Sequence, residues 1–388
     1  MLFLAYLCGE RYLIDRRIRS IPLRICVTGT RGKSSVTRLV ASGLREGGWR
    51  VLAKTTGSRP VIQFPDGLEE EVKRRGLPSV LEQKTILRLG ESLNIDVLVS
   101  EMMSIRPEAG HVESVQILKP QILVVTNVRL DHLAEMGSSK EQIARSFAAS
   151  IPEGGTVFVP QDEFLPVYRR VAEKMRAEVI PVSEDFLQGT SPRAQENFSL
   201  DWAENRRLAV AVADFLKLDR NVSLQGIKKA QPDFGSFKVW RIEWGAPPRH
   251  HQCMNCFAVN DPESTRRVLS ELGRKEKFKE KKWIGLLSLR KDRGDRTLQW
   301  LEALKEKRFP EFRKIYLVGL HARAFKRRLG DSGSISCDVL RRSQPEKLIS
   351  QIFQREQEEC VLVGLGNVGG IGRQLLEYWE KVGRPHDL

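Results

Sequence analysis

A glycine loop before the start of a helical pattern is the first feature of this chain that could do chemistry. The loop reads Gly29-Thr30-Arg31-Gly32-Lys33-Ser34-Ser35, and the helical pattern covers 33–46. Backbone N–H groups at such a turn point at a bound anion, and the helix dipole adds partial positive charge. Lys33 supplies a full positive charge, and Ser34 is placed to reach a magnesium ion carried by phosphates. These residues in this order predict a nucleoside triphosphate site.

The loop is shorter than the usual phosphate loop. The common pattern G-x-x-x-x-G-K-[ST] fails because Val27 stands five residues before Gly32, and the match is G-x-x-G-K-S from Gly29 to Ser34. A short loop of this kind is typical of amide-forming ligases and less typical of GTPases or motor ATPases.

Further polar groups stand where two later apolar runs stop. Glu101 ends one run, and Asn127, Asp131 and His132 follow the next. Ligands of open α/β sheets gather at the carboxyl ends of strands, so we expect Glu101 and His132 beside the phosphates held by Lys33. A carboxylate and an imidazole there can order magnesium or exchange protons. Taken singly, Glu101 could also be a surface carboxylate and His132 a loop cap.

Elements that position these groups are expected from the alternation of short apolar runs with helical patterns. The strands are expected at 24–28, 50–54, 96–100, 122–126, 155–159 and 178–182, and the helices at 33–46, 82–93, 140–149, 164–175 and 204–216. This rhythm predicts an α/β fold with a mostly parallel sheet covered by helices.

A break in the rhythm at 230–250 predicts a domain boundary. We therefore expect an N-terminal apolar and basic segment at 1–20, a central ATP-binding domain at 21–245 and a smaller α/β domain at 246–388. Strands of the last domain are expected near 254–259, 282–287, 314–319, 335–339 and 360–363, with a helix at 370–382.

The net charge of +15 needs a partner, and nucleic acid, an anionic membrane surface and an acidic substrate or product are the candidates. The densest basic runs, 274–282 and 323–328, could also be solvated helix faces. Aromatic-studded single-strand motifs, zinc fingers and basic zippers are absent from the sequence, which argues against nucleic acid.

Six dispersed cysteines do not suggest a disulfide scaffold, so a reducing cytoplasmic setting is expected. The apolar run 1–8 is far shorter than the roughly 20 residues that span a bilayer. It could dip into an interface or dock on a membrane partner, so we expect a peripheral location at the inner face of the cell membrane.

Segments over nearly the whole chain resemble the Mur ligase superfamily of ATP-dependent amide ligases, and within it the poly-γ-glutamate synthase branch of capsule biosynthesis. These segments are 29–39, 54–57, 82–83, 100–102, 127–137, 258–265, 290–297 and 364–370. The resemblance implies a central P-loop ATPase domain with a mostly parallel sheet, followed by a Rossmann-like α/β domain.

The resemblance also implies roles for single residues. Lys33 and the 29–34 backbone would cradle the β- and γ-phosphates, Ser34 and Glu101 would hold one magnesium ion, and His132 would help place a second. Lys33, Glu101 and His132 form the expected catalytic set. The remaining nucleotide-binding residues are expected to be Gly29, Thr30, Arg31, Gly32, Ser35, Asn127, the adenine-contacting Asn205, and Asn260, Asp261, Asp292 and Arg293 of the C-terminal domain.

The last four residues have a purely structural alternative, because Asn-Asp-Pro is a good turn and helix start and Arg-Lys-Asp-Arg is a common surface run. The chain also departs from the superfamily pattern. The carbamylated lysine that many Mur ligases use has no counterpart between Ile143 and Ile151, and Lys238 stands where a phosphate-contacting arginine is expected.

The activity implied is ATP-driven amide bond formation through an acyl phosphate, with glutamate and an acidic γ-linked polymer as substrate and product. Membrane subunits of a polymer synthase complex are the implied protein partners. Three alternatives stay open: a nucleic-acid-binding P-loop ATPase, another Mur-type ligase such as a folylpolyglutamate synthetase, and a scaffold subunit that needs partners for turnover.

Overall fold

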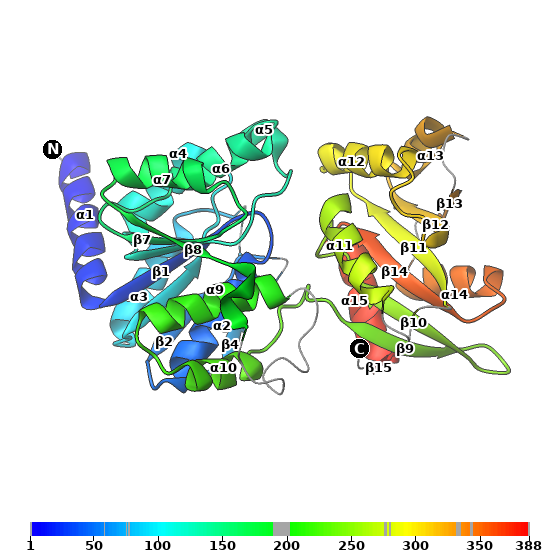
Figure 1. The fold of residues 1–388 in the computed structure, drawn as a ribbon, viewed down its shortest axis with the longest axis horizontal. Helices are drawn as coiled ribbons and strands as arrows, with labels where there is room; N and C mark the ends of the chain where they lie inside the picture. The colour runs from blue at the N-terminus through cyan, green and yellow to red at the C-terminus, as the bar shows by residue number, and fades with distance from the viewer. Residues whose placement is uncertain are drawn as a thin grey trace. The chain divides into compact units, whose positions relative to one another are not determined.

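The structure, a computed structural model, describes residues 2–57, 59–74, 76, 78–188, 202–274, 278, 281–330, 335–341 and 344–386. These residues form two compact α/β units, of which the first ends at Phe234 and the second begins at Gly235 (Figure 1). The division precedes the boundary expected at 245, because the strand at 239–244 pairs with the strand at 249–255 and so belongs to the second sheet.

The first unit contains an eight-stranded sheet in the order β4-β3-β2-β5-β1-β6-β7-β8. The neighbouring strands β2-β5-β1-β6-β7-β8 pair in parallel. The two remaining pairs, β2–β3 and β3–β4, are antiparallel. The strands are β1 (Leu23–Thr28), β2 (Val51–Lys54), β3 (Val61–Gln63), β4 (Glu69–Glu71), β5 (Val97–Glu101), β6 (Ile122–Val125), β7 (Thr156–Pro160) and β8 (Glu178–Val182). The helices are α1 (Leu2–Ser20), α2 (Lys33–Glu46), α3 (Glu82–Ser92), α4 (Pro107–His111), the π-helix η1 (Val112–Leu118), α5 (Leu133–Met136), α6 (Lys140–Ala148), α7 (Leu165–Lys174), the 3₁₀ helix η2 (Glu184–Leu187), α9 (Trp202–Phe215) and α10 (Arg220–Lys229).

Helices cover both faces of this sheet, which is why its central strands are buried along their length. On one face, Ile25 and Val27 of β1 belong to an apolar cluster with Val36 and Leu39 of α2, and with α9 and α10. Figure 1 shows these three helices together. On the other face, Cys26 joins a cluster with α1, α3, α6 and α7. The alternation of side chains along β1 therefore fixes α2, with the glycine loop before it, against the sheet.

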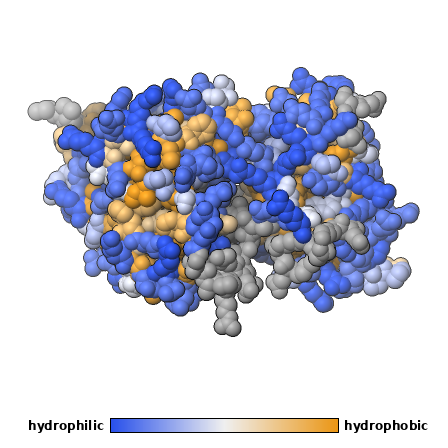
Figure 2. Space-filling view, in the orientation of Figure 1, coloured by the Kyte–Doolittle hydropathy of each residue, from blue (hydrophilic) through white to orange (hydrophobic). Residues whose placement is uncertain are grey.

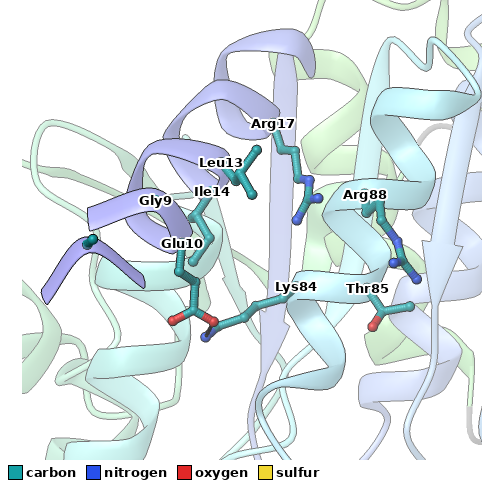
Figure 3. A pocket seen from close by; sticks show the side chains of 9 residues that line it. Gly9, Glu10, Leu13, Ile14, Arg17, Lys84, Thr85 and Arg88 are labelled. Atoms are coloured by element: carbon teal, nitrogen blue, oxygen red, sulfur yellow. Dashed lines mark hydrogen bonds and ion pairs between the residues drawn. The ribbon is translucent and has the colours of Figure 1, made fainter. Parts of the chain in front are cut away.

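The N-terminal segment forms helix α1, which packs against α3. Ile14 and Ile18 are buried there, and the Nζ atom of Lys84 lies 2.7 Å from the Oε1 atom of Glu10. An open groove remains between the two helices, and Figure 3 shows Glu10 and Lys84 facing each other across it. None of the helices in the described part of the chain combines the length and apolar composition needed to cross a bilayer.

The β3–β4 hairpin at the sheet edge was not expected from the sequence, because each strand has only three residues and β4 is entirely acidic. Arg38 of α2 forms an ion pair with Glu69 of β4, and a second hydrogen bond joins its Nη2 atom to Oε2 at 3.1 Å. This contact ties the hairpin to the helix that begins at the glycine loop.

The second unit contains a seven-stranded sheet in the order β13-β12-β11-β14-β10-β9-β15. Strand β10 begins earlier than the expected 254–259, because it first forms an antiparallel hairpin with β9. The strands are β9 (Val239–Trp244), β10 (Arg249–Asn255), β11 (Lys282–Leu289), β12 (Phe312–Gly319), β13 (Ser336–Val339), β14 (Cys360–Gly366) and β15 (Arg384–Pro385). The helices are α11 (Pro262–Leu272), α12 (Gly294–Lys305), α13 (Ala322–Leu329), α14 (Pro345–Arg355) and α15 (Ile371–Val382).

Candidate active site

The strand register of the first unit brings three chain segments to one sheet edge. Val27 of β1 pairs with Glu101 of β5 on one side and with Val124 of β6 on the other. The glycine loop after β1, the end of β5 and the segment after β6 therefore meet at the carboxyl edge of the sheet, where α/β proteins bind ligands.

The loop after β1 requires glycine at two positions. Gly29 has φ +127° and Gly32 has φ +77°, a backbone region that side chains rarely adopt. A Cβ on Gly29 would collide with the side chain of Thr126, and a Cβ on Gly32 would collide with that of Asn205. Within the described residues, no side chain caps the start of α2, so its first N–H groups face the loop for an anion to use.

Lys33 lies over this loop. Its Nζ atom donates a hydrogen bond to the carbonyl oxygen of Gly29 at 2.7 Å. Burial lowers the pKa of Lys33 from its usual value, and the carboxylate of Glu101 opposes that shift. The ammonium group is therefore held at the loop, beside a carboxylate that favours its charged form.

Glu101 joins the loop to two other segments. Its buried carboxylate oxygen Oε2 accepts hydrogen bonds from Ser34 Oγ and from the backbone N–H of Thr56, both at 2.7 Å. A hydroxyl and a carboxylate in contact are hard oxygen ligands of the kind that Mg²⁺ prefers. The expected pairing of Ser34 with Glu101 is thus present in the geometry.

Asn127 clamps the loop from the β6 side. Its Oδ1 accepts from the N–H of Arg31 at 3.0 Å, and its Nδ2 donates to the carbonyl of the same residue at 3.3 Å. The N–H of Thr30 donates to the carbonyl of Asn127 at 3.0 Å. Asn127 therefore fixes the loop backbone, a role that the sequence did not suggest.

His132 lies next to the loop through Asp131. The Nη1 atom of Arg31 lies 3.0 Å from Oδ2 of Asp131, and His132 Nε2 lies 3.8 Å from the same oxygen. The backbone N–H of His132 donates to Asp131 Oδ1 at 3.0 Å. His132 stands at the start of α5, with a φ of +49°. Asp131 thus links His132 to the glycine loop, and the metal-placing role of His132 stays a prediction.

Asn205 is buried in α9 with its side-chain amide against Gly32, so it belongs to the wall of the loop. Ser35 is half-buried in the first turn of α2. The adenine contact that the resemblance implies for Asn205 stays a prediction.

The four predicted residues of the second unit lie at two turns. Trp300 Nε1 donates to the carbonyl of Asn260 at 3.0 Å, and Asp261 caps α11 by accepting from the N–H of Ser264 at 2.9 Å. Their nucleotide contacts stay predictions, because a cap and a turn explain both residues structurally.

At the second of these turns, Asp292 accepts from Arg290 at 2.9 and 2.5 Å, and this hydrogen-bonded guanidinium lowers the pKa of the Asp292 carboxyl. Arg293 precedes α12 with its Nε atom 3.6 Å from Oδ1 of Asp295. Their nucleotide contacts also stay predictions.

Two buried residues beside the site were missed by sequence reasoning. Glu113 is fully buried and accepts from Gln83 Nε2 at 2.6 Å and from the N–H of Ser104 at 2.9 Å, which fixes the turn after Glu101. Lys54 is 1% exposed, with Nζ at 3.2 Å from Oε2 of the half-buried Glu82. Burial lowers the pKa of Lys54, and Glu82 opposes the shift. For Lys54 and Glu82 the signal was the presence of 54–57 and 82–83 among the resembling segments.

The site has the donor set for a nucleotide with a divalent cation: uncapped helix N–H groups, a lysine, and the paired oxygens of Ser34 and Glu101. Among the described residues, no group of three or more His, Cys, Asp or Glu side chains is arranged to hold a metal ion.

Two domain families match the chain in succession. The Mur ligase middle domain matches residues 27–207, and the poly-gamma-glutamate synthase CapB C-terminal domain matches residues 244–382. The first match contains the glycine loop, Glu101, His132 and Asn205, and the second contains the four predicted residues of the second unit.

Curated relatives cover most of the chain. It is 30% identical over 301 residues to the capsule biosynthesis protein CapB of Bacillus anthracis, covering 75% of this chain and 62% of the relative. It is 28% identical over 375 residues to the PGA synthase CapB of Bacillus subtilis (strain 168), covering 95% of this chain and 93% of the relative. The chain thus spans less than two thirds of the first relative and nearly all of the second.

Solved structures confirm the expected fold. A bifunctional folylpolyglutamate synthase/dihydrofolate synthase from Yersinia pestis, complexed with AMPPNP and Mn ion, matches with a TM-score of 0.68 at 16% identity, covering 96% of this chain and 92% of that one. MurF from Acinetobacter baumannii matches with a TM-score of 0.66 at 16% identity, covering 95% and 79%. At this identity the likeness concerns the fold alone.

Proposed function

We propose that this chain, which matches the Mur ligase middle domain at residues 27–207 and the poly-gamma-glutamate synthase CapB C-terminal domain at residues 244–382, is an ATP-dependent ligase that joins glutamate units through γ-amide bonds. The match of residues 244–382 carries the choice of substrate, since ligases of other substrates share the fold. A nucleic-acid-binding ATPase loses its support, because both matched domains are those of ligases or synthases.

ATP and a divalent metal fit the donors at the loop. Lys33 and the first N–H groups of α2 would bind the phosphates, and Ser34 and Glu101 would hold the ion. The bound ion would neutralise phosphate charge at the reacting end of the nucleotide. The structure of a folylpolyglutamate synthase with AMPPNP and Mn ion supports this combination in a protein of the same fold. Whether His132 helps to place a second ion is part of the proposal.

The reaction requires a leaving group on a carboxylate, which is a poor acylating agent at neutral pH. A carboxylate oxygen of glutamate attacks the γ-phosphorus, the bond to the bridging oxygen breaks, and ADP leaves. The amine of the next glutamate attacks the acyl phosphate carbon, the C–O bond breaks, phosphate leaves, and the amine loses a proton. The contribution of Lys33 is to hold negative charge in place during the first step, which is how phosphoryl transfer is mainly catalysed.

Partners and location follow from the same proposal. An acidic substrate and product would account for the net charge of +15. Exposed Phe3, Leu7 and Tyr12 on α1 and the groove between α1 and α3 support docking on membrane subunits of a synthase complex, at the inner face of the cell membrane.

The experiment is ADP release by the purified chain with Mg²⁺ and ATP, adding L-glutamate, D-glutamate, a short γ-linked glutamate oligomer, folate or RNA in turn. Mass spectrometry follows extension of the oligomer by one glutamyl residue. Lys33→Ala is expected to slow release by about a hundredfold or more, as loss of a transition-state charge contact does. Lys174→Ala, at an exposed lysine of α7, is the matched control and keeps the wild-type rate.

Two results would count against the proposal. Stimulation of ADP release by RNA, without stimulation by any glutamate compound, would favour a nucleic-acid-binding ATPase. Stimulation by folate alone would indicate another Mur-type ligase. Unchanged turnover in Lys33→Ala would show that the phosphate site has been assigned to the wrong loop.

A further inference from the structure

Three cationic side chains of the second unit converge on one carboxylate. Asp338 of β13 has Lys314 Nζ of β12 at 2.7 Å, Lys326 Nζ of α13 at 3.6 Å, and Arg355 Nη1 of α14 at 3.8 Å. The hydrogen bond from Lys314, with the other two cations, lowers the pKa of the Asp338 carboxyl. One carboxylate cannot neutralise three cations, so the cluster keeps a net positive charge.

Tyr316 forms the floor under two of these cations. It is fully buried and pairs with Asp338 in the β12–β13 ladder. Lys314 Nζ lies 5.1 Å from the centre of its ring, and the Arg355 guanidinium carbon lies 6.0 Å from it. Cation–π contacts of this kind hold both side chains over the sheet edge before any ligand arrives.

Helix α13 continues the positive surface from Lys326. Arg323, Lys326 and Arg327 stand at i, i+3 and i+4, so they share one exposed face, while Phe325 and Leu329 are buried on the other. Like charges at this spacing repel each other and destabilise a helix. Figure 1 places α13 beside β12 and β13 at the sheet edge.

We propose that this surface, made of Lys314, Arg323, Lys326, Arg327 and Arg355, binds the acidic γ-linked glutamate chain. The inference rests on the proposed function, and it adds a site for the polymer itself. Asp338 already occupies the position of a carboxylate among the cations, which indicates the chemical group that the cluster accepts. A γ-linked chain presents one free carboxylate on every unit, so it can engage several of these cations at once.

The distribution of exposed aromatic side chains favours an acidic polymer over nucleic acid as the ligand of this surface. Single-stranded nucleic acid is held by bases stacked on exposed aromatic rings. The large exposed aromatic side chains that the structure describes, Phe3, Tyr12 and Phe215, all lie in the first unit, and Tyr316 is fully covered. The part of the second unit that faces the viewer in Figure 2 is mostly hydrophilic. The surface therefore offers ion pairs without a stacking platform.

The test measures binding of a fluorescein-labelled γ-linked glutamate chain to the full-length protein by anisotropy, without ATP, at low and physiological salt. One variant replaces the basic face of α13 (Arg323→Gln, Lys326→Gln, Arg327→Gln). A matched control removes the same charges from the exposed face of α7 (Arg169→Gln, Arg170→Gln, Lys174→Gln). The α13 variant is expected to bind the chain about tenfold or more weakly, and the control within about twofold of wild type. Salt weakens binding by the wild type more than by the α13 variant.

The outcomes separate this inference from the proposed function. If the wild type releases ADP with glutamate but the α13 variant binds the chain as tightly as the α7 control, the surface has been misassigned and the ligase activity stands. If an RNA of equal charge binds more tightly than the glutamate chain and loses as much affinity in the α13 variant, the partner is nucleic acid and the inference is wrong. If neither glutamate nor its oligomers stimulate ADP release, the proposed function fails and the inference fails with it.

Discussion

Replacing Glu113 with glutamine tests whether a buried carboxylate holds in place the end of β5, where Glu101 is proposed to bind a metal ion. Its Oε2 atom accepts from Ser104 Oγ at 2.5 Å, from Ser104 N at 2.9 Å and from Met103 N at 3.1 Å. Its Oε1 atom accepts from Gln83 Nε2 at 2.6 Å, and that same amide lies 3.4 Å from the carbonyl oxygen of Glu101. Glu113 therefore fixes both the turn after Glu101 and the side chain of Gln83, which contacts the Glu101 carbonyl.

The expected loss of stability in Glu113→Gln follows from the hydrogen-bond donors that lose an acceptor. Glutamine offers one oxygen and one NH₂ group, and its best orientation keeps the oxygen at Ser104 and turns the NH₂ toward the amide of Gln83. The Gln83 N–H and the new NH₂ group then face each other without an acceptor, and the remaining bonds lose a charged acceptor, so Glu113→Gln is expected to lower the free energy of unfolding by about 2–4 kcal/mol. A protein of typical stability, about 5–15 kcal/mol, still folds.

Urea titration measures that loss, and the affinity for ATP with Mg²⁺ tests the link to the site. Displacement of Gln83 should disturb Glu101, and loss of a supporting contact behind a metal ligand typically weakens metal binding about 10- to 100-fold. The matched control is Glu356→Gln in the second unit, a buried carboxylate that binds Tyr316 and Lys282. The reasoning is refuted if both variants lose stability alike and both bind the nucleotide as the wild type does.

Three further variants test other parts of the structure. Gly29→Ala should abolish nucleotide binding measured by calorimetry, because it adds a collision to a strained φ, whereas Gly48→Ala, with φ +84° and open space around it, should cost only about 1 kcal/mol in urea titration. Burial lowers the pKa of His251 to about 4, so the folded state binds fewer protons than the unfolded state below about pH 6.5 and stability falls as the pH drops. Between pH 7 and pH 5 that loss is about 2 kcal/mol, and His251→Phe should remove it while His321→Phe does not. Ser139→Ala removes the hydrogen bond that caps α6 and should lower the free energy of unfolding by about 1 kcal/mol. An alanine substitution at a helix start without a side-chain cap should leave the free energy of unfolding unchanged.

The sequence predicted the parts of the site that local patterns specify. Strand β1, the glycine loop and helix α2 follow from a β-branched run, two glycines and an amphipathic repeat, all within 24 residues of one another (23 to 46). The approach of Glu101 and His132 to the loop followed from the rule that parallel strands end at one edge.

The missed parts depend on contacts between distant segments. Helix α1 is fixed by α3, about 70 residues further along the chain (Glu10 to Lys84), and β3 and β4 are too short to give a pattern of their own. Glu113 carries no local signal, because a carboxylate in a π-helix resembles any surface acid until its donors, Gln83 and Ser104, are known. The start of β10 was misplaced because its pairing with β9 lies outside the alternation that predicted the other strands.

The geometry of the loop also bears on how tightly a nucleotide can bind. Every segment around the loop holds it without a ligand: Asn127 bonds both backbone groups of Arg31, Asp131 pairs with its side chain, and Glu101 takes the hydroxyl of Ser34. A loop already fixed in this way loses little conformational freedom on binding phosphate, so less of the interaction energy is lost to ordering. The lysine is the exception, because its ammonium group bonds the Gly29 carbonyl and must exchange that bond for a phosphate oxygen. Under the proposed function, the residues that the sequence marked as nucleotide ligands would divide into those that hold the loop and those that contact the anion, and Lys33 with the first N–H groups of α2 would form the second class.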